Sequence, residues 1–153
     1  MARLTRRRHL QADHVWRAWL IAWLGGSVLG IVNGVIREVV YKDEVGDLTA
    51  HYISTATLIV LLTLYFLMLD RRWPLPTFPD ALLIGLAWAL LTASFDFGFG
   101  HYVDRKAWSE LARDYDLSAG RVWILVLAWV ALGPSAVRGI RRTKSRHRTA
   151  PAR

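Results

Sequence analysis

A carboxylate inside an apolar run is the first residue whose type and position could support chemistry. Asp96 lies four residues before Gly100, where a long apolar run ends. An unpaired charge at the middle of a bilayer costs about 2.5–3.5 kcal/mol on insertion scales, and less nearer the surface. We therefore expect Asp96 to face the interior of a helix bundle, near the outer end of its helix, and to have a partner.

Several polar residues lie at a similar depth, next to the ends of other apolar runs. They are Asn33, Arg37, Glu38, His51, His101 and Arg121. One interpretation is a network that holds the helices together, in which Asp96 pairs with Arg37 or Arg121. In this network Asn33 bonds to the second apolar run. The other interpretation is a site that senses or binds a proton or a small ligand, because intramembrane carboxylates with neighbouring histidines are typical of proton relays.

The same side chains fit a metal site less well. His51, His101, Glu38 and Asp96 are ligand types for zinc or a harder transition metal. No H-x-x-H or E-x-x-H spacing supports such a site, and the absence of cysteine excludes thiol catalysis and Cys-based zinc sites. We therefore expect no metal and no cofactor.

Enzymatic activity is an alternative with little support from motifs. His51, Asp96 and His101 could act on a lipid headgroup at the outer surface, but G-x-S-x-G, H-E-x-x-H and phosphate-loop motifs are missing. A subunit of a small proton-linked transporter is the nearer alternative, although the almost purely apolar inner halves of the runs argue against a complete transport path. The leading prediction is a small non-enzymatic integral membrane protein with a charge-paired polar layer near the outer leaflet.

Four apolar runs must position these residues. The chain has 153 residues, 54% of them hydrophobic. A helix needs about 20 residues to cross about 30 Å of hydrocarbon, and residues 16–36, 50–69, 80–100 and 118–137 meet this length. The runs lack strand alternation, so we predict an all-α polytopic membrane protein with one four-helix transmembrane domain over residues 16–137. We expect Thr49 to cap the second helix, Pro79 to start the third, and Gly133-Pro134 to kink or end the fourth.

The distribution of charge predicts the orientation. Thirteen of the 20 basic residues lie before the first run, between the second and third runs, or after the fourth, and Arg17 lies at the starting edge of the first run. This bias places both termini in the cytoplasm. Arginine far outnumbers lysine, which hints at a bacterial genome, so we expect the cytoplasmic membrane of a bacterium. Residues 1–15 form a basic N-terminus, and residues 138–153 form a basic tail that we expect to be disordered. Both termini suit anionic lipid headgroups, whereas the tail lacks aromatic residues for stacking on nucleic-acid bases.

The segment before the fourth run has a helical pattern. Trp108, Leu111, Ala112 and Tyr115 recur at helical spacing. The pattern predicts a short amphipathic helix on the outer membrane surface.

Small residues at four-residue spacing predict a helix contact. They are Gly26, Gly30 and Gly34 in the first run, and Gly85, Ala89 and Ala93 in the third. Such faces allow close backbone approach in lipid. We expect the two faces to pack together, and a homo-oligomer formed through the glycines is the alternative.

Three strings carry a resemblance to known proteins. They are Asn33-Gly34 with Arg37-Glu38, the segment from Phe95 to Tyr102, and Asp114-Tyr115 with Gly120-Arg121-Val122-Trp123. The arrangement resembles small, largely uncharacterised four-span bacterial membrane proteins. The likeness covers the four spans and neither tail. It implies the four-span fold, but no activity, cofactor or partner.

Overall fold

The computed structural model describes residues 2–103, 105, 107–113 and 122–148, and this part of the chain is helical without strands. The elements, in chain order, are α1 (Ala2–Ile36), the π-helix η1 (Arg37–Tyr41), α2 (Lys42–Val45), α3 (Asp47–Arg72), α4 (Phe78–Tyr102), α5 (Trp108–Arg113) and α6 (Trp123–Arg148). Four stretches are long and apolar enough to cross a membrane: Asp13–Val45, Asp47–Arg72, Phe78–Tyr102 and Trp123–Arg141. The all-α, four-span bundle is thus confirmed.

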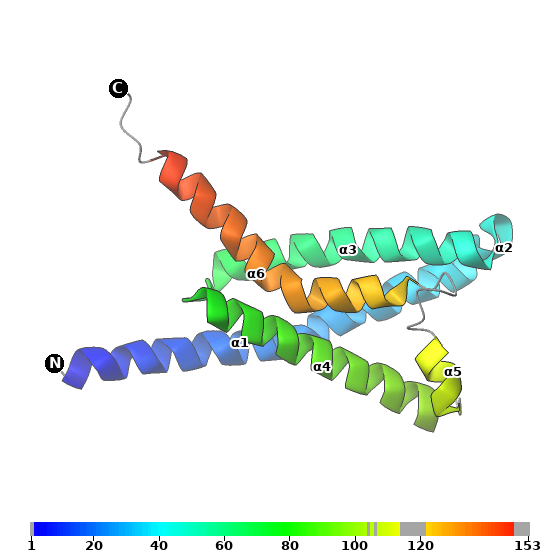
Figure 1. Ribbon diagram of the computed structural model, residues 1–153, viewed down its shortest axis with the longest axis horizontal. Coiled ribbons are helices and arrows are strands. Elements are labelled where there is room, and N and C mark those ends of the chain that lie inside the picture. The colour runs from blue at the N-terminus through cyan, green and yellow to red at the C-terminus, as the bar shows by residue number, and fades with distance from the viewer. Residues whose placement is uncertain (1, 104, 106, 114–121, 149–153) are drawn as a thin grey trace.

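Figure 1 shows how the bundle is arranged. The start of α1 and the end of α6 lie at one end, and α2 and α5 lie at the other. Many large apolar side chains point outward, among them Ile21, Leu64, Leu90 and Val60, each at least 58% exposed. Monomeric proteins in water rarely show such extensive apolar surfaces, so these faces fit contact with lipid chains and the chain is a multi-pass membrane protein.

The start of α3 differs from the prediction, and the start of α4 agrees with it. α3 begins at Asp47 behind Gly46, whose φ of 82° lets the chain reverse there, so the expectation that Thr49 caps this helix is wrong. α4 has the expected Pro79 in its first turn. Thr77 caps α4, because its Oγ1 accepts from the Asp80 N–H and the Asp80 carboxylate accepts from the Thr77 N–H.

An aromatic cluster fills the core near the end where α1 begins. Trp19 and Phe66 have ring centroids 6.2 Å apart, and Phe66 lies 5.3 Å from Trp88. The indole N–H of Trp88 donates to the Trp19 carbonyl at 2.9 Å, and that of Trp19 donates to the Trp73 carbonyl at 2.9 Å. These rings therefore both fill space and join α1 to α4 and to the loop after α3.

The small-residue faces do not pack together, so that prediction is wrong. A Cβ at Gly85 would lie 2.0 Å from the carbonyl oxygen of Ala131, which means that α4 uses Gly85 to approach the backbone of α6. Gly26 lies under the ring of Trp88, while a Cβ at Gly30 or Gly34 would meet no atom within 4 Å. Of the alanines predicted to face α1, Ala89 packs at the edge of the core and Ala93 is half-buried. The indole of Trp88 lies between α1 and α4, so their backbones cannot approach along the glycine face.

The C-terminal part of α6 also differs from expectation. The helix continues through Pro134 to Arg148, so the disorder expected for residues 138–153 does not apply as far as Arg148, and residues 149–153 lie outside the described part. Figure 1 shows α6 changing direction along its orange part. The helix contains Pro134, and a proline inside a helix is an expected cause of a kink.

Two arginines that the sequence placed beyond the last span are bound to the bundle. Arg141 donates to the buried carboxylate of Asp70 and to its carbonyl, both at 2.7 Å. Arg138 is buried and donates from Nε to the Leu75 carbonyl at 2.8 Å, and its Nη2 contacts the Pro76 carbonyl. These contacts join α6 to the end of α3 and to the α3–α4 loop.

Candidate functional site

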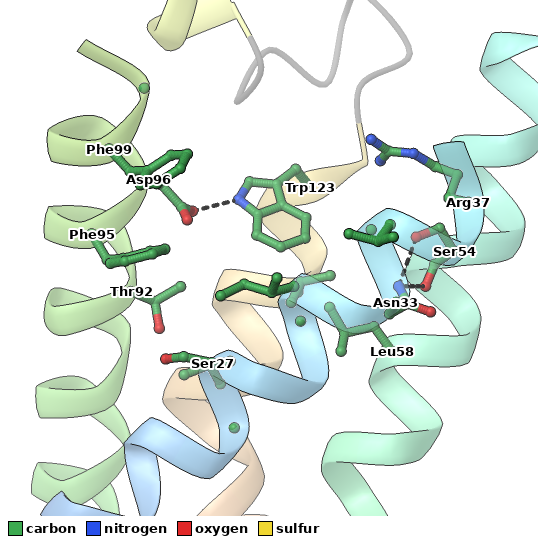
Figure 2. A pocket seen from close by; sticks show the side chains of 18 of the residues that line it. Ser27, Asn33, Arg37, Ser54, Leu58, Thr92, Phe95, Asp96, Phe99 and Trp123 are labelled. Atoms are coloured by element: carbon green, nitrogen blue, oxygen red, sulfur yellow. Dashed lines mark hydrogen bonds between the residues drawn. The ribbon is translucent and has the colours of Figure 1, made fainter. Parts of the chain in front are cut away.

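A cavity of about 750 Å³ lies between the four spans, toward the end that carries α2 and α5. Figure 2 shows its walls: α1 and α3 on one side, α4 on the other, and the start of α6 behind. The inner part is apolar and is lined by Leu58, Leu62, Trp88, Val126 and Val130. The cavity thus occupies the half of the bundle in which the sequence predicts the polar layer.

The opposite part of the cavity, which we call its polar end, is lined by charged and polar side chains. Its members are Arg37, Glu38, Lys42, Asp47, His51 and Asp96. The lining of the cavity therefore changes from apolar to charged along its length. Such a lining would complement an amphiphilic ligand that has an apolar tail and a polar head.

The glycine face of α1 forms part of the cavity wall. Gly26, Gly30 and Gly34 all line the cavity. No atom lies within 4 Å of a Cβ built at Gly30 or Gly34. The absence of side chains at these positions therefore leaves room beside α1.

Asn33 connects the first two spans as expected. Its buried amide donates to the Ser54 carbonyl at 3.0 Å and to the Ser54 hydroxyl at 2.7 Å. The prediction that Asn33 bonds to the second span is confirmed. This bond fixes α1 against α3 beside the polar end.

Arg37 is the first residue of η1, at the point where the helix changes from α to π geometry. Its side chain is 23% exposed, and its closest ionic contact is 3.5 Å from Nη2 to the Glu38 carboxylate. Its Nε atom is buried and has no hydrogen-bond partner in the part of the chain that the structure describes. A buried unsatisfied donor costs about 1–3 kcal/mol, and more for a charged group. Single π turns inside helices frequently occur at functional sites.

Asp96 faces the cavity from α4. Its Oδ2 accepts a hydrogen bond from the Trp123 indole at 2.9 Å. Figure 2 shows Asp96 and Arg37 on opposite sides of the cavity with Trp123 between them. The expectation that Asp96 has an interior partner is confirmed, but Arg37 pairs with Glu38 instead of Asp96. The other expected partner, Arg121, lies outside the described residues.

The remaining charges of the polar end form a chain along η1, α2 and the start of α3. Lys42 contacts the Glu38 carboxylate and lies 3.5 Å from the Asp47 carboxylate. His51 Nδ1 lies 3.0 Å from the Asp47 carbonyl oxygen and 3.8 Å from its carboxylate. Lys42 therefore balances both acidic residues, and His51 binds within its own helical turn.

His101 lies apart from this chain of charges. Its ring stacks on Trp108 of α5, with centroids 4.1 Å apart. The described residues contain no group of three or more histidines and acidic residues that could hold a metal ion. The structure therefore does not bring together His51, His101, Glu38 and Asp96 as ligands of one ion.

Sequence reasoning missed the contributions of tryptophan and threonine to this site. Trp23 donates to the Thr92 hydroxyl at 3.1 Å, and Trp123 donates to Asp96. Both indoles line the cavity. Their sequence signal was weak, because an indole near a membrane interface, such as Trp123, is normally explained as an anchor, and a deeper indole, such as Trp23, is normally explained as packing.

Comparison with known proteins adds no family to this description. No protein-family model matches the chain, and no curated protein or solved structure gives a significant match.

Proposed function

We propose that this protein is a non-enzymatic membrane protein that binds one small amphiphilic ligand in the cavity between its four spans. The observation that carries the proposal is the cavity itself, with apolar side chains at one end and charges at the other. A volume of about 750 Å³ is within the range of sites that hold one drug-sized molecule. Binding there would allow the protein to sense, store or present the ligand.

We further propose the setting that the basic residues favour. The protein lies in a bacterial cytoplasmic membrane with both termini in the cytoplasm, where their arginines contact anionic headgroups. In this orientation the polar end of the cavity is at the outer leaflet. The ligand would then come from that leaflet or from the space outside it.

A role as a subunit of a proton-linked transporter is the second candidate, favoured by the cavity-facing carboxylate of Asp96. Protein reconstituted in liposomes would accumulate a ligand only under an imposed proton gradient if this were its function. Ligand binding without gradient-dependent accumulation supports the binding role instead.

The binding function can be tested by placing a bulky side chain on the glycine face of α1, where it would fill the cavity. We expect Gly30→Phe to remove binding of dodecyl phosphate, because the new ring would occupy the cavity, while the protein folds normally. Native mass spectrometry should show a one-to-one adduct for the unmodified protein and at least a tenfold weaker adduct for the variant.

Gly98→Phe is the matched control. Gly98 is also a helical glycine at which an added Cβ would meet no atom within 4 Å, but it does not line the cavity. Its variant should bind like the unmodified protein. Equal binding by all three proteins would refute the proposal.

A further inference from the structure

We infer that the ligand of this cavity is a single-chain amphiphile with an anionic head, and that Arg37 binds the head. The inference rests on the proposed binding function and names the chemical class of its ligand. Phosphate and carboxylate heads both present anionic oxygens that accept hydrogen bonds from a guanidinium.

The Arg37 guanidinium has hydrogen-bond donors that its described neighbours do not satisfy. A guanidinium carries five N–H donors in a planar fork, and two of them together match a carboxylate or a phosphate. Nε of Arg37 is buried without a partner among the described residues, and Nη2 has only the 3.5 Å contact with Glu38. Although Nε itself is closed to solvent, the Arg37 side chain is 23% exposed and lines the cavity. An anionic oxygen there would accept from the guanidinium once the side chain turns to present Nε, and would supply the acceptor that the described residues lack.

The carboxylates on the wall beside Arg37 already have a cation. The nearest carboxylate, Glu38, is in contact with Lys42, which also lies 3.5 Å from Asp47. These two acidic groups already share a cation, so this wall offers a bound cation little additional stabilisation. Arg37, in contrast, has a buried donor without a partner among the described residues. Asp96, on the opposite wall, accepts from the Trp123 indole. The hydrogen-bonding capacity of Arg37, and not the net charge of the polar end, therefore favours an anionic head.

The cavity extends along α1 over a length that can be compared with one leaflet of a bilayer. Gly26 and Arg37 both line the cavity and are eleven residues apart along α1 and the start of η1. Helical rise makes this distance about 16 Å, which is about half of the roughly 30 Å hydrocarbon thickness of a bilayer. A chain whose head is at Arg37 would therefore extend over about one leaflet.

The inner part of the cavity suits an alkyl chain. Leu58, Leu62, Val126 and Val130 provide apolar lining, and the glycine face of α1 leaves room for a chain. The volume suits one chain with a small head. The structure thus points to one alkyl chain attached to a phosphate or carboxylate.

The experiment compares three probes that share one chain. Dodecyl phosphate, dodecanol and dodecyltrimethylammonium are titrated into the full-length protein in nanodiscs of zwitterionic lipid, and binding is followed by native mass spectrometry. We expect dodecyl phosphate to bind at least tenfold more tightly than the other two. Inorganic phosphate alone should bind at least tenfold more weakly than dodecyl phosphate, because it lacks the chain.

Variants of Arg37 assign the preference to this residue. Arg37→Gln should weaken binding of dodecyl phosphate by about 10- to 100-fold, the effect expected for loss of a hydrogen bond to a charged group. Arg37→Lys should lose part of the affinity, because an ammonium keeps the charge but not the fork. Arg105→Gln removes an exposed cation between α4 and α5 and should leave the affinity unchanged.

The outcomes separate this inference from the binding function. If dodecanol binds as tightly as dodecyl phosphate, and Gly30→Phe removes both, the anionic head is refuted and the cavity function stands. If dodecyltrimethylammonium binds best, the head is cationic and the inference is equally wrong. If no probe binds the unmodified protein, the binding function itself fails. Should the Arg37 variants not fold, the ranking of the probes on the unmodified protein still decides.

A last comparison identifies the source of the ligand. Dodecyl phosphate can be supplied from the aqueous phase, whereas a lysophosphatidic acid can be incorporated in the nanodisc bilayer. Binding of both supports the anionic amphiphile, and the tighter one indicates the source. Binding of neither refutes the inference.

Discussion

The packing of α4 on α6 gives the sharpest quantitative prediction of the fold. Gly85 approaches α6 so closely that a Cβ would lie 2.0 Å from the Ala131 carbonyl oxygen, whereas ordinary contact begins at 3.4 Å. In Gly85→Ala the two helices must therefore separate by about 1.4 Å, the difference between these distances. We expect the free energy of unfolding to fall by about 1–3 kcal/mol, the usual cost of overpacking.

The assay is reversible unfolding in mixed micelles, with helix content measured as the fraction of sodium dodecyl sulfate increases. Gly30→Ala and Gly98→Ala are the matched controls, because a Cβ at either position meets nothing within 4 Å. They should change the free energy by no more than about 1 kcal/mol, in the stabilising direction, since alanine has the higher helix propensity. The reasoning is refuted if Gly85→Ala costs no more than the controls. A large cost for Gly30→Ala would instead support packing of the first and third spans through their small residues.

Two further predictions concern polar contacts between helices, measured by the same unfolding assay. Asp70→Asn should lower the free energy of unfolding by about 1–3 kcal/mol, because it weakens the charged acceptor of Arg141; Arg72→Gln, which removes an exposed charge two residues later, should have little effect. Equal stability of these two variants would show that the ion pair contributes nothing. Asn33→Ala should cost about 0.5–1.5 kcal/mol through loss of its two bonds to Ser54, since hydrogen bonds between membrane helices average about 0.6 kcal/mol each. An unchanged free energy would contradict this estimate.

The sequence predicted the four spans well, because length and hydrophobicity determine which helices can cross a bilayer. It also predicted the bond of Asn33 to the second span and an interior partner for Asp96, since a polar group in lipid needs one. These predictions depend only on whether a segment or a polar group is stable in lipid, and the composition of each run is enough to decide this.

Predictions about which helix faces which were less successful. The glycines of α1 were expected to meet the small residues of α4, but Trp88 fills the space at Gly26, and Gly85 faces α6. Four-residue spacing shows that a backbone can approach closely, but not which neighbour approaches it. The result depends on large side chains elsewhere, and no local pattern contains that information.

The same limit explains the basic residues after the last span. Arg138 and Arg141 were interpreted only as charges that set orientation, yet both bind the end of α3 or the following loop. Their helical spacing of three residues is visible in the sequence. Their acceptors are a carboxylate and backbone carbonyls about 60–70 residues earlier, which only the fold brings near.

The central claim is that an alkyl chain lies between the spans and not on the lipid-facing surface. Dodecyl phosphate with a photoreactive group at the end of its chain tests this directly, because α3 has residues of both kinds. Leu58 and Leu62 are buried and line the cavity, whereas Val60 and Leu64 are each 58% exposed on the surface of the bundle. Peptide mass spectrometry after illumination should find the label on Leu58 and Leu62, and less of it in Gly30→Phe. Label confined to Val60 and Leu64, unchanged by that substitution, would contradict the account.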